Sequence, residues 1–137
     1  GHHLHGSLHT DGVAIALEMA IKTRTTNGML IHHSDRGLQY CSSQYQQILA
    51  KNGILPSMTD GYDCYQNALA ERVNGILKYE FLIVKPANMK EAARLIREAV
   101  EIYNTKMPHL SLKYKTPDQI HNKKSLPELT DKDYIYI

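Results

Sequence analysis

Apolar residues recur at helical spacing in the first half of the chain, in two stretches that predict helices. The first begins at Thr10 or Asp11, because either side chain can cap a helix. The second begins at Ser42 or Ser43 and runs through Asn52. Both stretches place their large apolar residues on one face, so both helices are expected to pack against a common core.

Two short apolar runs predict strands. The run 29–31 has the pattern of a strand that is buried on both faces, and Asp35 follows shortly after it. The run 54–58 predicts an edge strand, because Pro56 has no N–H to donate. A weak alternation over residues 2–8 predicts the end of a further strand. Ligands in open α/β sheets gather at the carboxyl ends of strands, which is where Asp35 is expected.

A helix expected from about residue 67 to residue 81 has two contrasting faces. Its polar face carries Asn67, Glu71, Asn74 and Lys78, and its apolar face carries Leu69, Val73, Ile76 and Leu77. Glu71 is therefore expected to point away from the core.

Two more helices are expected in the last third of the chain. Asn88 and Glu91 have the spacing of a capping box, and the helix that they begin is expected to run to about Tyr103. A short helix is expected from Thr116 to His121. We expect residues 1–121 to form one partial catalytic core and residues 122–137 to form a carboxyl-terminal tail.

The composition excludes some classes of protein. A chain of 137 residues with 42% hydrophobic and 22% charged residues is typical of one soluble globular domain. No apolar run approaches the length of a membrane span, so no membrane partner is expected. Cys41 and Cys64 are far apart and fit reduced thiols, and we find no Cys/His spacing of a zinc site.

Charge alone does not identify a partner, because the net charge is only +2. The segment from Lys106 to Lys124 is more basic, with five lysines and a single acidic residue, Asp118. Such a segment fits either contacts with phosphates or an ordinary solvated surface.

Asp35 and Glu71 are separated by 35 residues, and each lies in a dense polar motif. The first motif reads His32-His33-Ser34-Asp35-Arg36-Gly37-Leu38-Gln39-Tyr40, and the second runs from Asn67 to Lys78. Taken singly, an Asp after a strand is usually a turn residue, and a Glu on an exposed helix face is usually just solvated. As a pair, two carboxylates from separate elements can hold divalent cations for phosphoryl transfer.

These motifs resemble the integrase-type catalytic core of bacterial insertion-sequence transposases, the group closest to retroviral integrases. That family uses an Asp-Asp-Glu triad with a 35-residue gap between the second Asp and the Glu, which Asp35 and Glu71 match. Lys78 holds the place of a Lys or Arg that contacts DNA near the reacting phosphate. The runs 36–40 and 107–117 also resemble the family.

The resemblance implies a ribonuclease H-like α/β fold, which would be incomplete here because its amino-terminal strands would precede residue 10. It implies two Mg²⁺ (or Mn²⁺) ions, with Asp35 and Glu71 as catalytic metal ligands. It also implies DNA partners (transposon ends and target), homo-oligomers and a bacterial cytoplasmic, nucleoid-associated location. The residues expected to contact DNA are Lys78, Arg36, Asn67, Asn74 and Lys115.

One departure from the family concerns the first Asp of the triad, which should lie several tens of residues before Asp35. Asp11 is too close in sequence and begins a helix, so it cannot replace the missing residue. Asp60 and Asp63 lie on a loop that could approach the site, but the family gives them no metal role. Gln66 stands where the family often has an Asp outside the triad.

These features favour a fragment of a transposase that is inactive by itself. One alternative is a non-catalytic truncated product that binds DNA or the full-length transposase, and another is an expression fragment of a larger enzyme. A different ribonuclease H-like nuclease is a third alternative. The spacing of Lys78 and the stretch 108–117 argue against that last one.

We predict that this chain alone neither cleaves nor joins DNA, because it supplies two of the three carboxylates that the family uses. Labelled transposon-end DNA incubated with Mg²⁺ or Mn²⁺ should give no more product than the Glu71→Gln variant gives. Cleavage that this substitution abolishes would contradict the prediction, and would mean that another residue, such as Asp60 or Asp63, supplies the third ligand.

Overall fold

The computed structural model describes residues 1–7, 9–25, 28–60 and 67–122. The chain divides into two compact units, of which the first holds Gly1–Val73 and the second begins at Asn74. The loop residues Asp63 and Gln66 and the tail after Asn122 lie outside the described residues.

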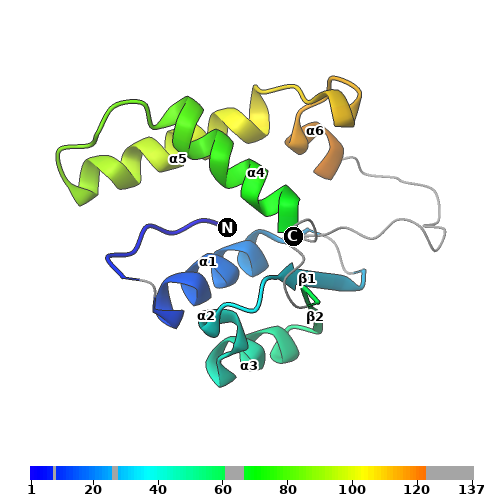
Figure 1. Cartoon of the computed structure of the whole chain (residues 1–137). Helices are drawn as coiled ribbons and strands as arrows, with labels where there is room; N and C mark the ends of the chain where they lie inside the picture. The colour runs from blue at the N-terminus through cyan, green and yellow to red at the C-terminus, as the bar shows by residue number, and fades with distance from the viewer. Residues whose placement is uncertain (8, 26–27, 61–66, 123–137) are drawn as a thin grey trace. The chain divides into compact units, whose positions relative to one another are not determined.

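The first unit is a parallel strand pair with helices (Figure 1). Its elements are α1 (Thr10–Thr23), β1 (Leu30–Ser34), α2 (Leu38–Cys41), α3 (Ser43–Lys51) and β2 (Ile54–Met58). The two strands pair in register from Leu30 opposite Ile54 to Ser34 opposite Met58. Because parallel strands need a long crossover, α2 and α3 occupy the connection between them. The carboxyl ends of both strands therefore lie at the same edge of the sheet.

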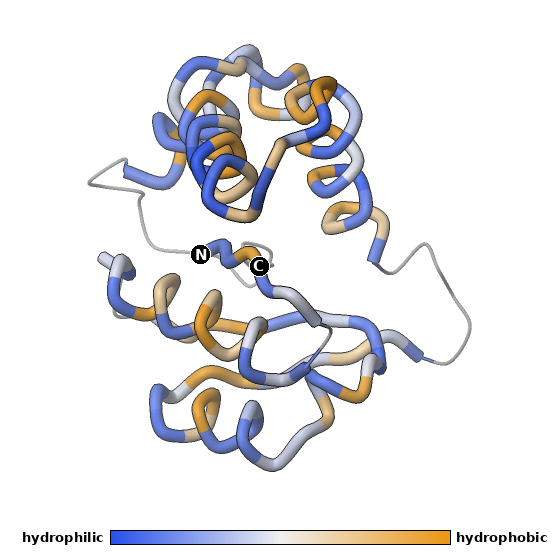
Figure 2. Tube along the Cα trace, turned by 90° about the vertical axis from the view of Figure 1, so that its left-hand side faces the viewer, coloured by the Kyte–Doolittle hydropathy of each residue, from blue (hydrophilic) through white to orange (hydrophobic). Residues whose placement is uncertain are grey.

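The core of the first unit forms where α1 and α3 meet the sheet. Its buried residues are Ala14 and Leu17 of α1, Tyr45 and Leu49 of α3, and Ile54 of β2. Along both helices the apolar residues recur at intervals between hydrophilic ones (Figure 2). The helical spacing predicted from the sequence is thus confirmed as the pattern that builds this core.

The second unit is helical in the part that the structure describes. The long helix here runs as α4 (Ala68–Ile76), which begins in the first unit, and continues as a π-helical turn, η2 (Leu77–Phe81). It is followed by α5 (Met89–Thr105), the 3₁₀ turn η3 (Leu110–Leu112) and α6 (Pro117–His121). The helix α5 packs against both η2 and α6.

Three of the predicted helix starts are confirmed by their caps. The hydroxyl of Ser42 accepts the N–H of Tyr45 at the start of α3. The side chain of Asn88 accepts the N–H of Glu91 at 2.9 Å, and Thr116 forms a complete capping box. Each cap satisfies a backbone donor that the helix itself leaves unpaired.

Several predictions about local structure are wrong. Residues 2–7 form no strand, and α1 is preceded by His9, whose side chain does not cap it, so Thr10 and Asp11 lie inside its first turn. The strand β1 continues to Ser34, beyond the apolar run, and its residues before Ser34 are only half-buried. Backbone pairing with β2 extends the strand where hydrophobicity does not.

The apolar face predicted for α4 is also only partly right. Ile76 is buried, Val73 and Leu77 are half-buried, but Leu69 is 63% exposed. None of the helices in the described part of the chain has the length and apolarity needed to cross a membrane.

A small aromatic cluster joins β1 to α2 and α3, and consists of His32, Tyr40 and Tyr45. The hydroxyl of Tyr45 lies 3.0 Å from Nε2 of His32, and the two tyrosine rings meet edge to face with centroids 5.4 Å apart. Burial, and then the charge of nearby His33, lower the pKa of His32. Burial raises the pKa of Tyr45, and burial with the charge of Asp35 raises that of Tyr40. The cluster therefore favours uncharged side chains.

We predict that this cluster makes the fold sensitive to acid. Because the pKa of His32 is lower in the folded chain, the unfolded chain takes up the proton first as the pH falls. The free energy of unfolding should therefore be highest above about pH 6.5 and should fall below it. Urea unfolding measured at several pH values should show a weaker pH dependence for His32→Gln, which keeps a hydrogen-bond acceptor but cannot titrate.

The matched control is His121→Gln, because His121 is exposed at the end of α6. This substitution should leave the pH dependence of unfolding unchanged. If the pH dependence of unfolding is unchanged in His32→Gln, His32 is not its source.

Candidate metal and DNA site

Asp35 directly follows β1, at the edge of the sheet where both strands end. Its Oδ1 accepts the backbone N–H of Gly37 at 2.8 Å, which closes a tight turn and fixes the direction of the carboxylate. Gly37 lies close to the side chains of Asp35 and Gln39. A Cβ at position 37 would lie 2.9 Å from that Oδ1 and 2.7 Å from Nε2 of Gln39. A side chain at this position would therefore displace these two side chains, although the backbone φ of −56° is open to any residue.

Arg36 joins this turn to the end of β2. Its Nε donates to the carbonyl oxygen of Thr59 at 2.8 Å, and its terminal nitrogen lies 3.7 Å from Oδ1 of Asp60. Thr59 is buried, and its own N–H donates to the carbonyl oxygen of Ser34. Arg36 is predicted to contact DNA, but in this structure its side chain links the ends of β1 and β2. Its side chain is still 61% exposed, so it can also meet a phosphate.

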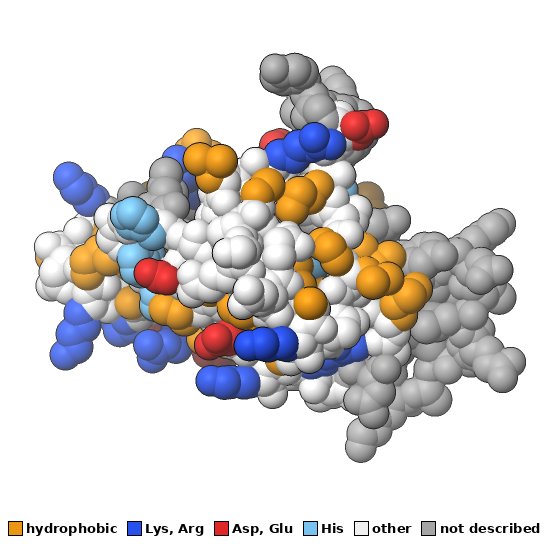
Figure 3. Space-filling view, turned by 90° about the horizontal axis from the view of Figure 1, so that it is seen from below, with side chains coloured by type: hydrophobic (Ala, Val, Ile, Leu, Met, Phe, Trp, Pro, Cys, Tyr) orange, Lys and Arg blue, Asp and Glu red, His pale blue; other side chains and the backbone are white. Residues whose placement is uncertain are grey.

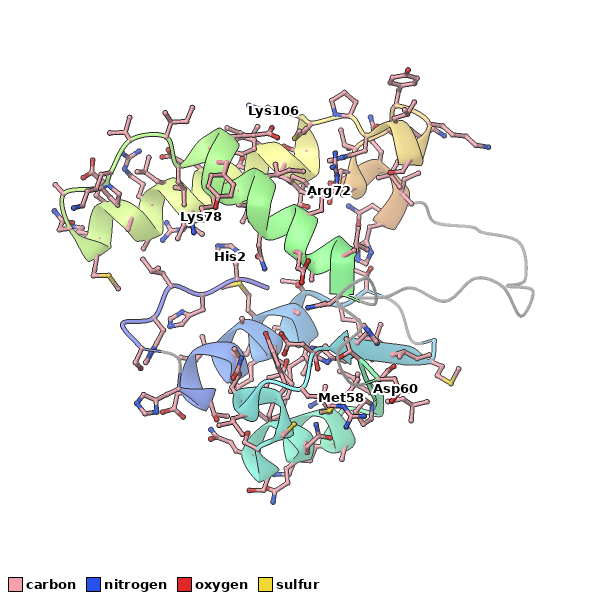
Figure 4. The ribbon with its side chains drawn as sticks, in the orientation of Figure 1. His2, Met58, Asp60, Arg72, Lys78 and Lys106 are labelled. Carbon is pink, nitrogen blue, oxygen red and sulfur yellow. The ribbon has the colours of Figure 1, made fainter. Side chains whose placement is uncertain are left out.

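Sequence reasoning missed these links across the two strands. Asp60, which the sequence places on a loop that could approach the site, pairs with Arg36 near Met58 at the end of β2 (Figure 4). A second link joins Nδ1 of His33 to the hydroxyl of Ser57, at 2.9 Å between residues that are opposite in the register. Only the pairing of the strands brings such residues together, so no local pattern indicates them.

Glu71 lies in the first turn of α4 and is exposed, as predicted. A carboxylate is favoured near the amino end of a helix, where backbone N–H groups point outward. On the same predicted face Asn74 and Lys78 are exposed and Asn67 is half-buried. Glu71 belongs to the first unit, whereas Asn74 and Lys78 belong to the second.

Lys78 falls within η2, where the helix is wider than an α-helix. Its Nζ lies 5.4 Å from the centroid of the Tyr79 ring. Lys115, the last predicted DNA contact, forms an isolated antiparallel bridge with His109 in the second unit. Figure 4 labels Lys78 beside η2 and Lys106 at the end of α5.

The predicted approach of Asp35 and Glu71 to one point stays a prediction, because the chain between them includes residues outside the described part. Within the described ranges, no three side chains of His, Cys, Asp or Glu gather as a metal site. Asp11, rejected above as a third ligand, accepts a hydrogen bond from Gln44 at 3.3 Å instead.

Two family models, both described as an integrase core domain, match the chain over residues 1–64 and 52–117. An insertion element IS600 uncharacterized 31 kDa protein of Shigella sonnei is 42% identical over 99 residues, which cover 71% of this chain and 36% of that protein. The transposase for insertion sequence element IS904 of Lactococcus lactis is 37% identical over 92 residues, covering 64% of this chain and 36% of that protein. The chain thus spans little more than a third of the length of these relatives.

Solved structures share the fold. A chain of the simian T-cell lymphotropic virus intasome superposes with a TM-score of 0.76 at 21% identity, over 96% of this chain and 46% of that one. The catalytic core domain of BIV integrase gives a TM-score of 0.64 at 18% identity, over 85% and 73%. The magnesium complex of the HTLV-2 integrase core, in its trimeric form, gives 0.62 at 23% identity, over 83% and 70%.

These neighbours confirm the ribonuclease H-like fold class, although the described sheet holds only two strands. The two family models together match residues 1–117, and the relatives include insertion-sequence transposases. The chain therefore belongs to the integrase core domain family, and its sequence is similar to parts of insertion-sequence transposases.

Proposed function

We propose that this chain supplies part of the active site of a transposase that cleaves the DNA ends of an insertion sequence and joins them to new DNA. One observation carries this proposal. A carboxylate is fixed at the carboxyl end of β1 by a backbone N–H, and a second carboxylate, Glu71, is exposed in the first turn of α4. Transposase relatives of matching sequence support the reaction class.

The donor set fits a divalent metal. Asp35 uses one oxygen for the N–H of Gly37, which leaves its second oxygen for a cation, and Glu71 is exposed. Hard cations such as Mg²⁺ and Mn²⁺ prefer carboxylate oxygens. We assign both residues as metal ligands, in a site that takes two ions in the complete enzyme. Metal bound there would polarise the phosphodiester and stabilise the leaving 3′-oxygen. The HTLV-2 integrase core was solved with magnesium.

The protein's own side chains would position the DNA. Arg36 is held by Thr59 and Asp60 with its guanidinium partly exposed, so it can pair with a phosphate beside Asp35. Lys78 and Lys115 would contact phosphates from the second unit, with Asn67 and Asn74 as neutral donors. Phosphate contacts position DNA without reading its sequence, so binding by this chain should be non-specific and should weaken with salt.

We treat residues 1–121 as one core and residues 122–137 as a tail. One integrase core model supports this, because it matches residues 52–117 and so continues across the boundary between Val73 and Asn74. A protein that acts on bacterial DNA would work at the nucleoid.

We predict that Mn²⁺ binds this chain through Asp35 and Glu71 together. In an NMR titration, Mn²⁺ should broaden the signals around both residues at the same concentration. Asp35→Asn and Glu71→Gln should each weaken the binding by roughly tenfold or more, since each removes one of two charged ligands. Gly37→Ala should also weaken it, because the added methyl would crowd Oδ1 of Asp35.

The matched control is Asp11→Asn, because Asp11 is an exposed acid of the same unit that contacts Gln44. This variant should bind Mn²⁺ like the unmodified chain. If Mn²⁺ broadens the signals around only one of the two carboxylates, the shared metal site is wrong.

We further propose that the chain forms homo-oligomers through the sheet. In the described part of the chain the sheet has two strands, so each strand has an edge without a strand partner. Met29, just before β1, and Leu55, within β2, are 69% and 49% exposed. Apolar side chains are also visible on the face of the molecule seen from below (Figure 3). Open edges next to apolar side chains favour pairing with another strand, which a two-fold axis can provide in both copies at once.

We predict that light scattering gives a mass above 15.6 kDa that rises with concentration. Met29→Lys should shift the chain towards the monomer, because charge beside an edge strand opposes pairing. Met89→Lys is the matched control, because Met89 is 54% exposed but lies on α5, and it should change nothing. A mass of 15.6 kDa at every concentration would show that the edges do not pair.

A further inference from the structure

A hollow lies in the second unit, where the end of α5 meets the start of α6. Its volume is about 650 Å³, and its lining residues are Thr105, Lys115, Thr116, Asp118, Gln119 and Asn122. That volume is within the range of small-molecule sites. Each lining residue carries a polar group on its side chain, so the hollow offers hydrogen-bonding groups of several kinds.

The groups in the hollow match the edge of a nucleobase better than a phosphate. The carboxylate of Asp118 would repel a phosphate but can accept hydrogen bonds from the amino group of adenine or cytosine. The amide of Gln119 uses its oxygen to accept the N–H of Thr116, so its NH₂ remains as the donor. Asn122 adds a second amide. Among the lining residues only Lys115 favours a phosphate, and it directly follows the turn at Lys113 and Tyr114.

That preceding turn is held in an uncommon conformation. Lys113 and Tyr114 have φ values of 55° and 60°, and in the described part of the chain they are the only residues other than glycine with positive φ. A bulky aromatic residue in this region is a marked outlier. The turn is held by hydrogen bonds from the N–H of Tyr114 to the carbonyl oxygen of His109 and from the N–H of His109 to that of Lys115.

In this turn an aromatic side chain is exposed to solvent, directly before a residue that lines the hollow. Tyr114 is 74% exposed, Lys113 is exposed, and Lys115, the next residue, lines the hollow. Lys106, labelled in Figure 4, ends α5 directly after Thr105. An exposed aromatic ring among lysines is the arrangement with which proteins hold single-stranded nucleic acid: bases stack on the ring and ammonium groups meet the phosphates.

We propose that this turn and hollow bind an unpaired nucleotide of a DNA strand. The base stacks on Tyr114, its edge enters the hollow near Asp118, and its phosphates lie towards Lys113 and Lys115. This inference rests on the proposed function, because it assumes that the chain handles DNA ends. It adds a second DNA contact, which uses neither Asp35 nor Glu71 and acts on a strand end that is not paired.

The test compares a labelled blunt duplex with the same duplex carrying a short single-stranded tail that contains 2-aminopurine. Fluorescence anisotropy should show that the tail strengthens binding by about tenfold, which is the effect of one stacked base. The fluorescence of 2-aminopurine should fall as the base stacks. Tyr114→Asn should remove both effects and Tyr114→Phe should keep both, since Asn tolerates the backbone conformation and Phe retains a ring.

Tyr79→Asn is the matched control, because Tyr79 is 73% exposed in the same unit but lies in η2. It should retain the preference for the tail. A tail made only of thymine, which has no amino group, should bind less tightly than one of adenine or cytosine.

Three results would overturn the inference: equal binding of tailed and blunt duplexes, an unchanged preference in Tyr114→Asn, or an equal loss in Tyr79→Asn. If the blunt duplex still binds in those cases, the proposed function stands while the inference fails. If no DNA binds at all, both fail. The preference for the tail can depend on Tyr114 while Mn²⁺ binding stays unchanged in Asp35→Asn and Glu71→Gln. This result would support the inference and overturn the proposed metal site.

Discussion

The parallel pairing of β1 with β2 is the interaction on which the candidate site depends. It brings Ser34 opposite Met58, so the residues that follow each strand emerge side by side. Thr59 can then donate to the carbonyl oxygen of Ser34, and Arg36 can reach the carbonyl oxygen of Thr59. The pairing itself is maintained by the crossover helix, whose Tyr45 and Leu49 are buried with Ile54 against α1. Loss of this small core would separate the strand ends and release the turn that holds Asp35.

Sequence reasoning succeeded where local rules decide the structure. The caps at Ser42, Asn88 and Thr116 follow from short-range hydrogen bonds between a side chain and the next turn. The exposed position of Glu71 follows from helical periodicity. The position of Asp35 just after a strand follows from an apolar run that ends in polar residues. Each of these features depends on a few residues that are neighbours in the sequence, so the sequence alone is enough to predict it.

The features that sequence reasoning missed depend on contacts between distant residues. The tie from Arg36 to Thr59 and the bond between His33 and Ser57 join positions more than 20 residues apart. The aromatic cluster of His32 with Tyr45 likewise forms only when α3 packs on β1. Residues 2–7 show the opposite limit: the strand predicted there is wrong, because a weak alternation does not form a strand without a partner strand. Leu69 is exposed for a similar reason, since periodicity gives the face of a helix but not whether another element covers it.

The turn at Asp35 also bears on how this motif can vary among related chains. The carboxylate is oriented by a backbone N–H, so its direction does not depend on the identity of the neighbouring side chains. Leu38, next to the turn, is 87% exposed and takes no part in holding it. Substitutions at such positions change the exposed surface beside the turn without moving the carboxylate. A side chain at position 37 would instead displace that carboxylate, so related chains can vary the surroundings of the site while its ligand stays in place.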